Sequence, residues 1–220
     1  MPIKKDMPPA AVYYAVAEID ARQRPSAAGH SLLLAALSRA TGRPPHYFAI
    51  TKRPSGQPVA VTIAGAATDM FVSLSHSGGL VACAATTLGP IGIDLEVAKP
   101  GRNLAGIAEA AFGPAERREW AERGPAGFYR IWTLREAMAK TTGAGLSQAA
   151  NRCDQVADGP EQGHWSQGDW HFLHKHVPPD RYLSLAVKPA ARMKAAIDWI
   201  ALPLGIANPT PSRGADKFNI

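Results

Sequence analysis

Four short apolar runs separated by turn residues fill residues 59–96, and they constrain the fold of this 220-residue chain more than any other feature. The runs cover residues 59–63, 70–75, 80–86 and 91–96, with glycine in each connecting stretch. Runs of this length predict β-strands, and connections this short join antiparallel neighbours. The first half of the chain is therefore predicted to contain several short antiparallel strands close together.

Helical segments lie on both sides of these strands. Residues 26–40 combine a candidate N-cap at Ser26 with a leucine cluster and a stop at Gly42, after an apolar strand at 11–19. Beyond residue 100 we predict helices at 104–111, 114–122 and 127–141, followed by strands at 170–176 and 182–187. The mixture predicts an α+β (α/β) fold, and the length suits one large domain or two small ones.

Two acidic residues stand on the last of the four predicted strands. In the run IGIDLE at 91–96, Asp94 and Glu96 lie at i and i+2, so both carboxylates leave the same face of the strand. Such a pair forms either an exposed polar face or part of a cation site. Magnesium is a candidate, because proteins hold it with a few carboxylates together with substrate phosphate oxygens.

A second charged motif follows about 40 residues later, on the helix predicted at 127–141. In the run WTLREAMAK at 132–140, Trp132, Glu136 and Lys140 recur every four residues and share one helical stripe. Glutamate four residues before lysine is a common surface pair, but a tryptophan on the same stripe favours burial. Three carboxylates and a lysine on two rigid elements could hold a divalent cation beside a phosphate.

The two motifs in this order, G-I-D-x-E and W-[ST]-x-[KR]-E-A-x-x-K, resemble the signature of the Sfp-type 4′-phosphopantetheinyl transferases. The resemblance runs from about residue 55 to residue 146 and includes S-H-S at 75–77. It implies two similar α/β halves related by pseudo-twofold symmetry, with the active site between them. We accordingly divide the chain into 1–100, with coenzyme A binding and the first metal motif; 101–190, with the second metal motif; and 191–220, a C-terminal helix and tail.

The resemblance also implies a set of site residues. Asp94, Glu96 and Glu136 would be magnesium ligands, and Lys140 would contact a phosphate of coenzyme A and assist proton transfer. His76 would contact a coenzyme A phosphate, with Ser75 beside the nucleotide. A histidine at the end of a strand is otherwise more often a structural residue.

Two further residues are assigned by the same resemblance. Glu116, in F-x-x-x-E at 112–116, matches a candidate general base, although a glutamate in the first turn of a helix is also favoured by the helix dipole. Either Glu116, or Lys140 through water, would take the proton of the attacking serine. Arg24 falls near the expected position of a 3′-phosphate contact, whereas Gln57 stands where a lysine is common.

Composition sets the expected partners and location. The 24 Lys+Arg against 18 Asp+Glu give +6, which is either a solvated surface or a complement to an acidic partner. We expect no nucleic acid partner, because there is no basic run with interleaved aromatic residues. The two isolated cysteines form no disulfide framework, and no apolar stretch reaches the roughly 20 residues of a membrane span. We expect a cytoplasmic protein without a signal peptide or a membrane span.

The resemblance thus implies a magnesium-dependent enzyme that moves 4′-phosphopantetheine from coenzyme A to a serine of an acidic acyl or peptidyl carrier protein. The enzyme would release 3′,5′-ADP and act as a monomer. One alternative is a magnesium-dependent hydrolase that acts on a nucleotide or a pyrophosphate through the same carboxylates. Another is a degenerate relative that only binds coenzyme A or a carrier protein. The pathway of the carrier (fatty acid, polyketide or nonribosomal peptide) is left open.

Overall fold

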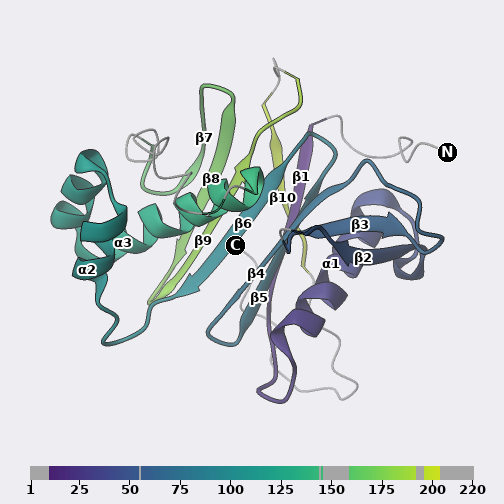
Figure 1. The fold of residues 1–220 in the computed structure, drawn as a ribbon, viewed down its shortest axis with the longest axis horizontal. Coiled ribbons are helices and arrows are strands. Elements are labelled where there is room, and N and C mark those ends of the chain that lie inside the picture. The colour runs from purple at the N-terminus through teal and green to yellow at the C-terminus, as the bar shows by residue number, and fades with distance from the viewer. Residues whose placement is uncertain (1–9, 55, 144, 146–158, 192–195, 204–220) are drawn as a thin grey trace.

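The computed structural model describes residues 10–54, 56–143, 145, 159–191 and 196–203, which form a mixed α+β fold (Figure 1). The elements in chain order are β1 (Ala11–Glu18), α1 (Pro25–Thr41), a 3₁₀ turn (Pro45–Tyr47), β2 (Phe48–Lys52), β3 (Pro58–Thr62), β4 (Phe71–Ser77), β5 (Leu80–Thr86), β6 (Ile91–Val97), α2 (Leu104–Ala111), α3 (Pro114–Thr142), β7 (Gly163–Gln167), β8 (Trp170–Val177), β9 (Arg181–Val187) and β10 (Asp198–Ala201).

Two four-stranded sheets occupy the centre of the molecule. The first sheet has the strand order β10-β1-β5-β4, with β1 and β10 parallel and the other pairs antiparallel. The second sheet has the order β6-β9-β8-β7 and is antiparallel throughout. The four strands predicted at 59–96 are present but are divided among three sheets, since β3 pairs with β2 in a separate hairpin and β6 joins the second sheet.

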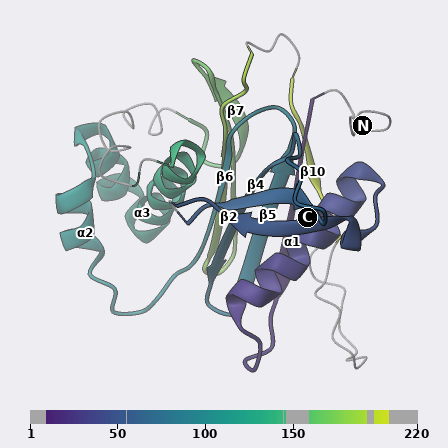
Figure 2. The same ribbon diagram turned by 45° about the vertical axis from the view of Figure 1, so that its right-hand side comes forward.

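The sheets pack against each other and each carries a helix on its outer face (Figure 2). Along β1, Val12 and Tyr14 face the second sheet, whereas Tyr13 and Ala15 face α1, as the two-residue period of a strand requires. Ile93 and its neighbours on the second sheet fill the layer between the two sheets. The other face of the second sheet packs against α3. The resulting order of layers is α1, first sheet, second sheet, α3.

Serine side chains join the two sheets where their edge strands β4 and β6 meet. The hydroxyl oxygens of Ser73, Ser75 and Ser77 accept the main-chain N–H groups of Ile93, Leu95 and Val97 at 3.1, 3.2 and 3.2 Å. The three serines share one face of β4 because they lie at alternate positions. We call this set of three serines the serine ladder.

Within 191–220, where a C-terminal helix and tail were expected, the structure describes strand β10 at Asp198–Ala201. Residues 192–195 and 204–220 lie outside the described residues, so the expected helix and tail stay predictions. In β10, Trp199 packs against the core between the sheets and Ile200 against the core under α1. Burial on opposite sides at successive positions has the period of a strand, and the open edge of β1 supplies the hydrogen-bond partners.

Helix α3 contains the two helices predicted at 114–122 and 127–141. They meet at a kink where Gly124 has φ 59° and Pro125 follows, so the chain changes direction without a loop. The helix ends at Gly143, which has φ 72° and donates its N–H to the carbonyl of Ala139. No helix within the described ranges is long and apolar enough to cross a membrane.

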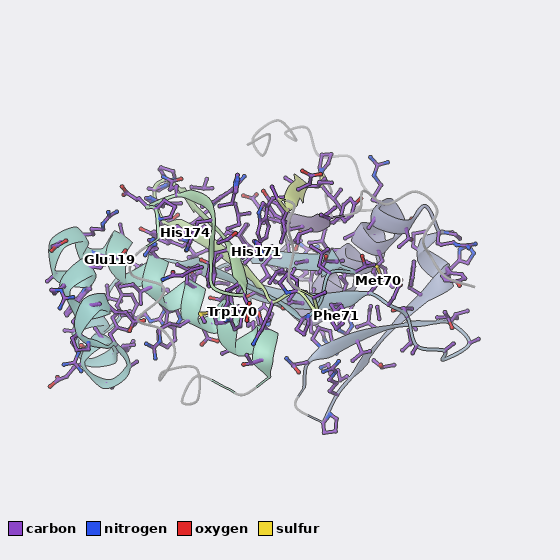
Figure 3. The ribbon with its side chains drawn as sticks, turned by 90° about the horizontal axis from the view of Figure 1, so that it is seen from above. Met70, Phe71, Glu119, Trp170, His171 and His174 are labelled. Atoms are coloured by element: carbon purple, nitrogen blue, oxygen red, sulfur yellow. The ribbon has the colours of Figure 1, made fainter. Side chains whose placement is uncertain are left out.

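A buried polar network ties α3 to the second sheet. His174 on β8 bonds through Nδ1 to the hydroxyl of Ser184 at 2.8 Å, and Ser184 bonds to Thr133 of α3 at 2.7 Å. Figure 3 labels His174 on the side of the molecule that carries α3. Burial lowers the pKa of His174 to about 3, and the positive charge of Arg130 and the nearby His176 add to the effect. The imidazole is therefore neutral in the folded protein at neutral pH.

We expect this neutral histidine to make folding stability fall as the pH falls. Its pKa is lower in the folded chain than the value near 6.5 of an unfolded one, so the unfolded state binds the extra proton between pH 6.5 and pH 3. The loss between pH 7 and pH 4 is at most about 3 kcal/mol. Urea titrations at several pH values should show a weaker pH dependence for His174→Gln than for the wild type. His46→Gln, at an exposed histidine, is the matched control, and an unchanged pH dependence in His174→Gln would contradict the assignment.

Candidate active site

Strand β6 and helix α3 approach each other at Gly92. A Cβ atom at this position would lie 1.9 Å from the carbonyl oxygen of Ala137 and 2.8 Å from the N and Oγ1 atoms of Thr141. Thr141 also donates its hydroxyl to the carbonyl of Ala186 at 2.9 Å. Only glycine permits this separation, and it brings the Glu136–Lys140 stripe of the helix over Asp94 on the strand.

Asp94 and Lys140 form an ion pair at the centre of the site. The Nζ atom of Lys140 donates to Oδ1 of Asp94 at 2.7 Å, to the Ser75 hydroxyl at 3.0 Å and to the Ile93 carbonyl at 3.1 Å. Ser75 donates in turn to Oδ1 of Asp94 at 2.9 Å. Asp94 is 5% exposed, and its second oxygen, Oδ2, is buried and has no hydrogen-bond partner among the described residues. A buried carboxylate oxygen without a donor is an electrostatic cost that a cation would remove.

Glu136 adds a second carboxylate to this cluster, and its side chain is half-buried. Burial raises its pKa above the ordinary value, and the negative charge of Asp94 raises it further, while Lys140 opposes both effects. Burial likewise raises the pKa of Asp94, against the ammonium of Lys140. The two groups thus face a shared excess of negative charge. A cation placed between them would favour the ionised form of both.

Glu96 lies at the edge of the cluster and is held from two sides. Its Oε2 accepts the Ser77 hydroxyl at 3.1 Å, and its Oε1 lies 3.3 Å from Nη1 of Arg102. The charge of Glu96 raises the pKa of both Asp94 and Glu136, so the three carboxylates interact electrostatically. The serine ladder therefore contacts both acidic residues of β6.

The three carboxylates suit a hard divalent cation by their chemistry and charge. Within the described residues, no three His, Cys, Asp or Glu side chains are already arranged around one metal position. The unpartnered Oδ2 of Asp94 and the raised pKa of Glu136 are the features that fit such an ion. Carboxylate oxygens are the ligands that magnesium prefers.

The β2–β3 hairpin reaches the end of the same helix. Gln57, which follows the turn between these strands, donates from its side-chain amide to the carbonyl of Lys140 at 2.5 Å. A glutamine at this position, where the resemblance leads one to expect lysine, therefore caps a main-chain carbonyl in the last turn of α3. Gly143 and Gly145 of the G-x-G-L segment follow directly, while Ala144 and Leu146 lie outside the described residues.

Glu116 forms a buried ion pair at the start of α3. Its Oε2 accepts hydrogen bonds from Nη1 of Arg135 at 2.6 Å and from the main-chain N–H of Gly113 at 2.7 Å. The second of these bonds caps the N-terminus of α3. Glu116 and Arg135 are each 1% exposed. These contacts correspond to the alternative reading of Glu116 as a residue that stabilises the start of a helix.

His76 and Arg24 are exposed, and within the described part of the chain neither forms a hydrogen bond or an ion pair with the acidic cluster. His76 alternates with Ser75 on β4 and so points to the other face of the strand. Arg24 is the residue immediately before α1. Their assigned contacts with coenzyme A stay predictions.

Three residues of the site were not assigned a role from the sequence. Ser73 and Ser77 could have been found, because S-x-S-x-S places hydroxyls at the same two-residue period as Asp94 and Glu96. Arg102 could not, because it stands in the loop between β6 and α2 and meets Glu96 and the rings of α3 only in the folded chain.

Comparison with known proteins finds a family match over part of the chain. Residues 90–187 match the family model of the 4′-phosphopantetheinyl transferase superfamily. This stretch contains Asp94, Glu96, Glu136 and Lys140, together with β6, α3 and the second sheet. The resemblance predicted from the two motifs is thereby confirmed for this part of the chain.

Individual relatives carry the same name. The chain is 38% identical over 87 residues to the 4′-phosphopantetheinyl transferase AcpT of Salmonella typhi, which covers 38% of this chain and 45% of the relative. It is 33% identical over 123 residues to the 4′-phosphopantetheinyl transferase of Bacillus subtilis, and the match covers 54% of this chain and 52% of that relative. It is 32% identical over 125 residues to the 4′-phosphopantetheinyl transferase HetI of Nostoc, and the match covers 55% of this chain and 52% of that relative. The chain spans about half the length of these curated relatives.

Proposed function

We propose that the chain is a magnesium-dependent 4′-phosphopantetheinyl transferase that modifies a serine of an apo acyl or peptidyl carrier protein. The observation that carries the proposal is the convergence of Asp94, Glu136 and Lys140 where β6 meets α3, inside the stretch that matches the superfamily. The predicted arrangement of two related halves with a site between them is part of the proposal, as is the division at residue 100. The meeting of the two sheets at the serine ladder supports it.

Asp94, Glu96 and Glu136 are the groups that would hold magnesium. The ion would supply positive charge to the pyrophosphate of coenzyme A, where negative charge develops as the phosphate leaves. The protein contributes by keeping the carboxylates in place. Gly92 sets the distance between strand and helix, and the serine ladder holds the Asp94 and Glu96 side chains.

The proposed reaction balances as a simple substitution at phosphorus. The serine oxygen of the carrier forms a bond to the phosphorus that bears the pantetheine group, and the bond from that phosphorus to the bridging oxygen breaks. The products are the phosphopantetheinyl serine, 3′,5′-ADP and one proton. Lys140 has an ammonium group among acceptors at the site and would bind a phosphate oxygen of coenzyme A.

The proton of the serine needs an acceptor, for which Glu116 and Lys140 are the two candidates. Glu116 is engaged by Arg135 and by the N–H of Gly113, and it is almost fully buried. Lys140 lies in the acidic cluster and its side chain is 30% exposed. The position of Lys140 beside the proposed metal ligands favours it over Glu116 for proton transfer through a water molecule, and Glu116 would be a positioning residue at the start of α3.

The remaining parts of the proposal concern partners. A chain with a net charge of +6 would attract an acidic carrier protein, which favours rapid encounter. Coenzyme A would be bound with contributions from Ser75, His76 and Arg24. A monomeric state and a cytoplasmic location complete the proposal.

The experiment that tests it is incubation with coenzyme A, magnesium and a panel of apo carrier proteins, followed by intact-protein mass spectrometry. We expect at least one carrier to gain the mass of one phosphopantetheine group on its serine, with stoichiometric release of 3′,5′-ADP. Omission of magnesium, with a chelator present, should abolish the gain. Release of nucleotide without any gain of mass would identify a hydrolase, and binding without turnover a degenerate relative.

A further inference from the structure

Arg102 occupies an unusual position at the edge of the proposed metal site. Its side chain is 21% exposed, and its Nη1 atom lies 3.3 Å from Oε1 of Glu96. The guanidinium carbon lies 5.1 Å from the ring centroid of Trp132, 5.7 Å from that of Tyr129 and 5.8 Å from that of Phe128. Arg102 therefore touches a predicted metal ligand on one side and three aromatic rings of α3 on the other.

The acidic cluster thus contains two cations of the protein itself. Lys140 pairs with Asp94, and Arg102 pairs with Glu96. In the described part of the chain, no basic side chain forms an ion pair with Glu136. Glu96 is the carboxylate whose two oxygens are both engaged by the protein, one by Arg102 and one by Ser77. A divalent cation that uses Glu96 must therefore compete with Arg102.

We propose that Arg102 is a tethered counter-ion, which holds Glu96 while the site lacks metal and yields it when a divalent cation binds. The inference rests on the proposed function, because it takes Glu96 as a magnesium ligand. Arg102 is in this sense a positioning residue, since it acts on the metal through Glu96. Its presence sets the metal concentration at which the site fills.

The energies of the contacts that Arg102 makes with Glu96 and with the aromatic rings explain how it can release Glu96 to a divalent cation. A partly exposed ion pair contributes roughly 0–1 kcal/mol. A guanidinium on an aromatic face gains about 0.5–1 kcal/mol or more per favourable contact, and here three rings surround it. Arg102 can therefore lose Glu96 and remain on the rings, so the side chain does not have to move far into solvent.

The test is a calorimetric titration of magnesium into the protein without coenzyme A or carrier. We expect Arg102→Met, which keeps the aliphatic packing over the rings, to bind magnesium roughly three- to tenfold more tightly than the wild type. Arg102→Lys keeps the charge and should stay within about twofold of the wild type. The matched control is Arg123→Met, which removes one positive charge from an exposed ion pair with Glu161 and should leave the affinity unchanged.

A double-mutant cycle separates an effect through Glu96 from a general loss of positive charge. Because the charge of Arg102 also acts on Glu136, we expect Arg102→Met to raise magnesium affinity clearly less in a Glu96→Gln background than in the wild type if Arg102 acts mainly through Glu96. A circular dichroism spectrum and a melting curve for each variant verify folding.

The outcomes divide clearly. Equal or weaker magnesium binding by Arg102→Met, with a wild type that binds, overturns the inference and leaves the metal assignment intact. The same gain in the Glu96→Gln background also overturns it. If neither the wild type nor Arg102→Met binds magnesium, the metal assignment and the inference both fail, and the mass-spectrometric transfer assay judges the transferase activity separately. Binding by Arg102→Met alone supports the inference.

Discussion

Replacing Glu136 by alanine is expected to lower phosphopantetheine transfer by at least about a hundredfold, and Asp94→Ala to do the same. Both side chains contribute buried negative charge beside the ammonium group of Lys140. If they hold the ion that neutralises the departing phosphate, the loss falls on the chemical step. The measurement is the initial rate of carrier modification at saturating coenzyme A, for both variants.

The two variants differ in what they should do to folding. Glu136 is half-buried, and burial together with Asp94 raises the pKa of its carboxyl, so its removal relieves repulsion and should leave the melting temperature unchanged or higher. Asp94 is buried and paired, so Asp94→Ala leaves Lys140 without its carboxylate partner and should lower the melting temperature. Glu122→Gln, at an exposed position of the same helix, is the control and should retain full activity. Full transfer by Glu136→Ala would refute the metal assignment.

A single methyl group at Gly92 should be strongly destabilising. The Cβ atom of Gly92→Ala would lie 1.9 Å from a main-chain oxygen of α3, which cannot move aside as a flexible side chain can. Helix and strand must therefore separate, at a cost of about 3 kcal/mol or more. Transfer should fall as well, because Glu136 and Lys140 travel with the helix. Urea unfolding followed by circular dichroism measures the first effect.

Gly29→Ala provides a matched comparison in α1. A Cβ atom there would meet Leu74 at 3.6 Å, an ordinary contact, and alanine favours a helix over glycine by about 1 kcal/mol. We therefore expect Gly29→Ala to be neutral or stabilising. Equal effects of the two substitutions would contradict the proposed role of Gly92 as the spacer between β6 and α3.

The sequence predicted the parts of the site that depend on local periodicity. Asp94 and Glu96 share a face because of the two-residue period of β6, and Glu136 and Lys140 share a stripe because of the helical period of α3. Strands β5 and β6 and helices α1 and α2 were predicted almost to the residue. Their apolar patterns are long enough, and their turn residues distinct enough, to define each element without tertiary contacts.

The rest depends on contacts between distant segments. Strand β10 has four residues and forms because the edge of β1 is available for pairing. No local sequence pattern predicts this pairing. The pairing of β6 with β9 rather than with its predecessor β5 is likewise a matter of sheet packing. Arg102 and Gln57 reach the site through contacts with Glu96 and with the carbonyl of Lys140, and their sequence neighbourhoods carry no motif for these roles.

The serine ladder has a consequence for the open edge of β6. Strands β4 and β6 are the outermost strands of their sheets on this side, and exposed outer strands can recruit another chain by main-chain pairing. Here Ser73, Ser75 and Ser77 take three amide groups of β6 that would otherwise be open to such recruitment, and Lys140 takes the Ile93 carbonyl. Loss of the hydroxyls should therefore leave three main-chain amides of β6 without these acceptors. The residues that organise the proposed catalytic centre would thus also protect one sheet edge from pairing with another chain.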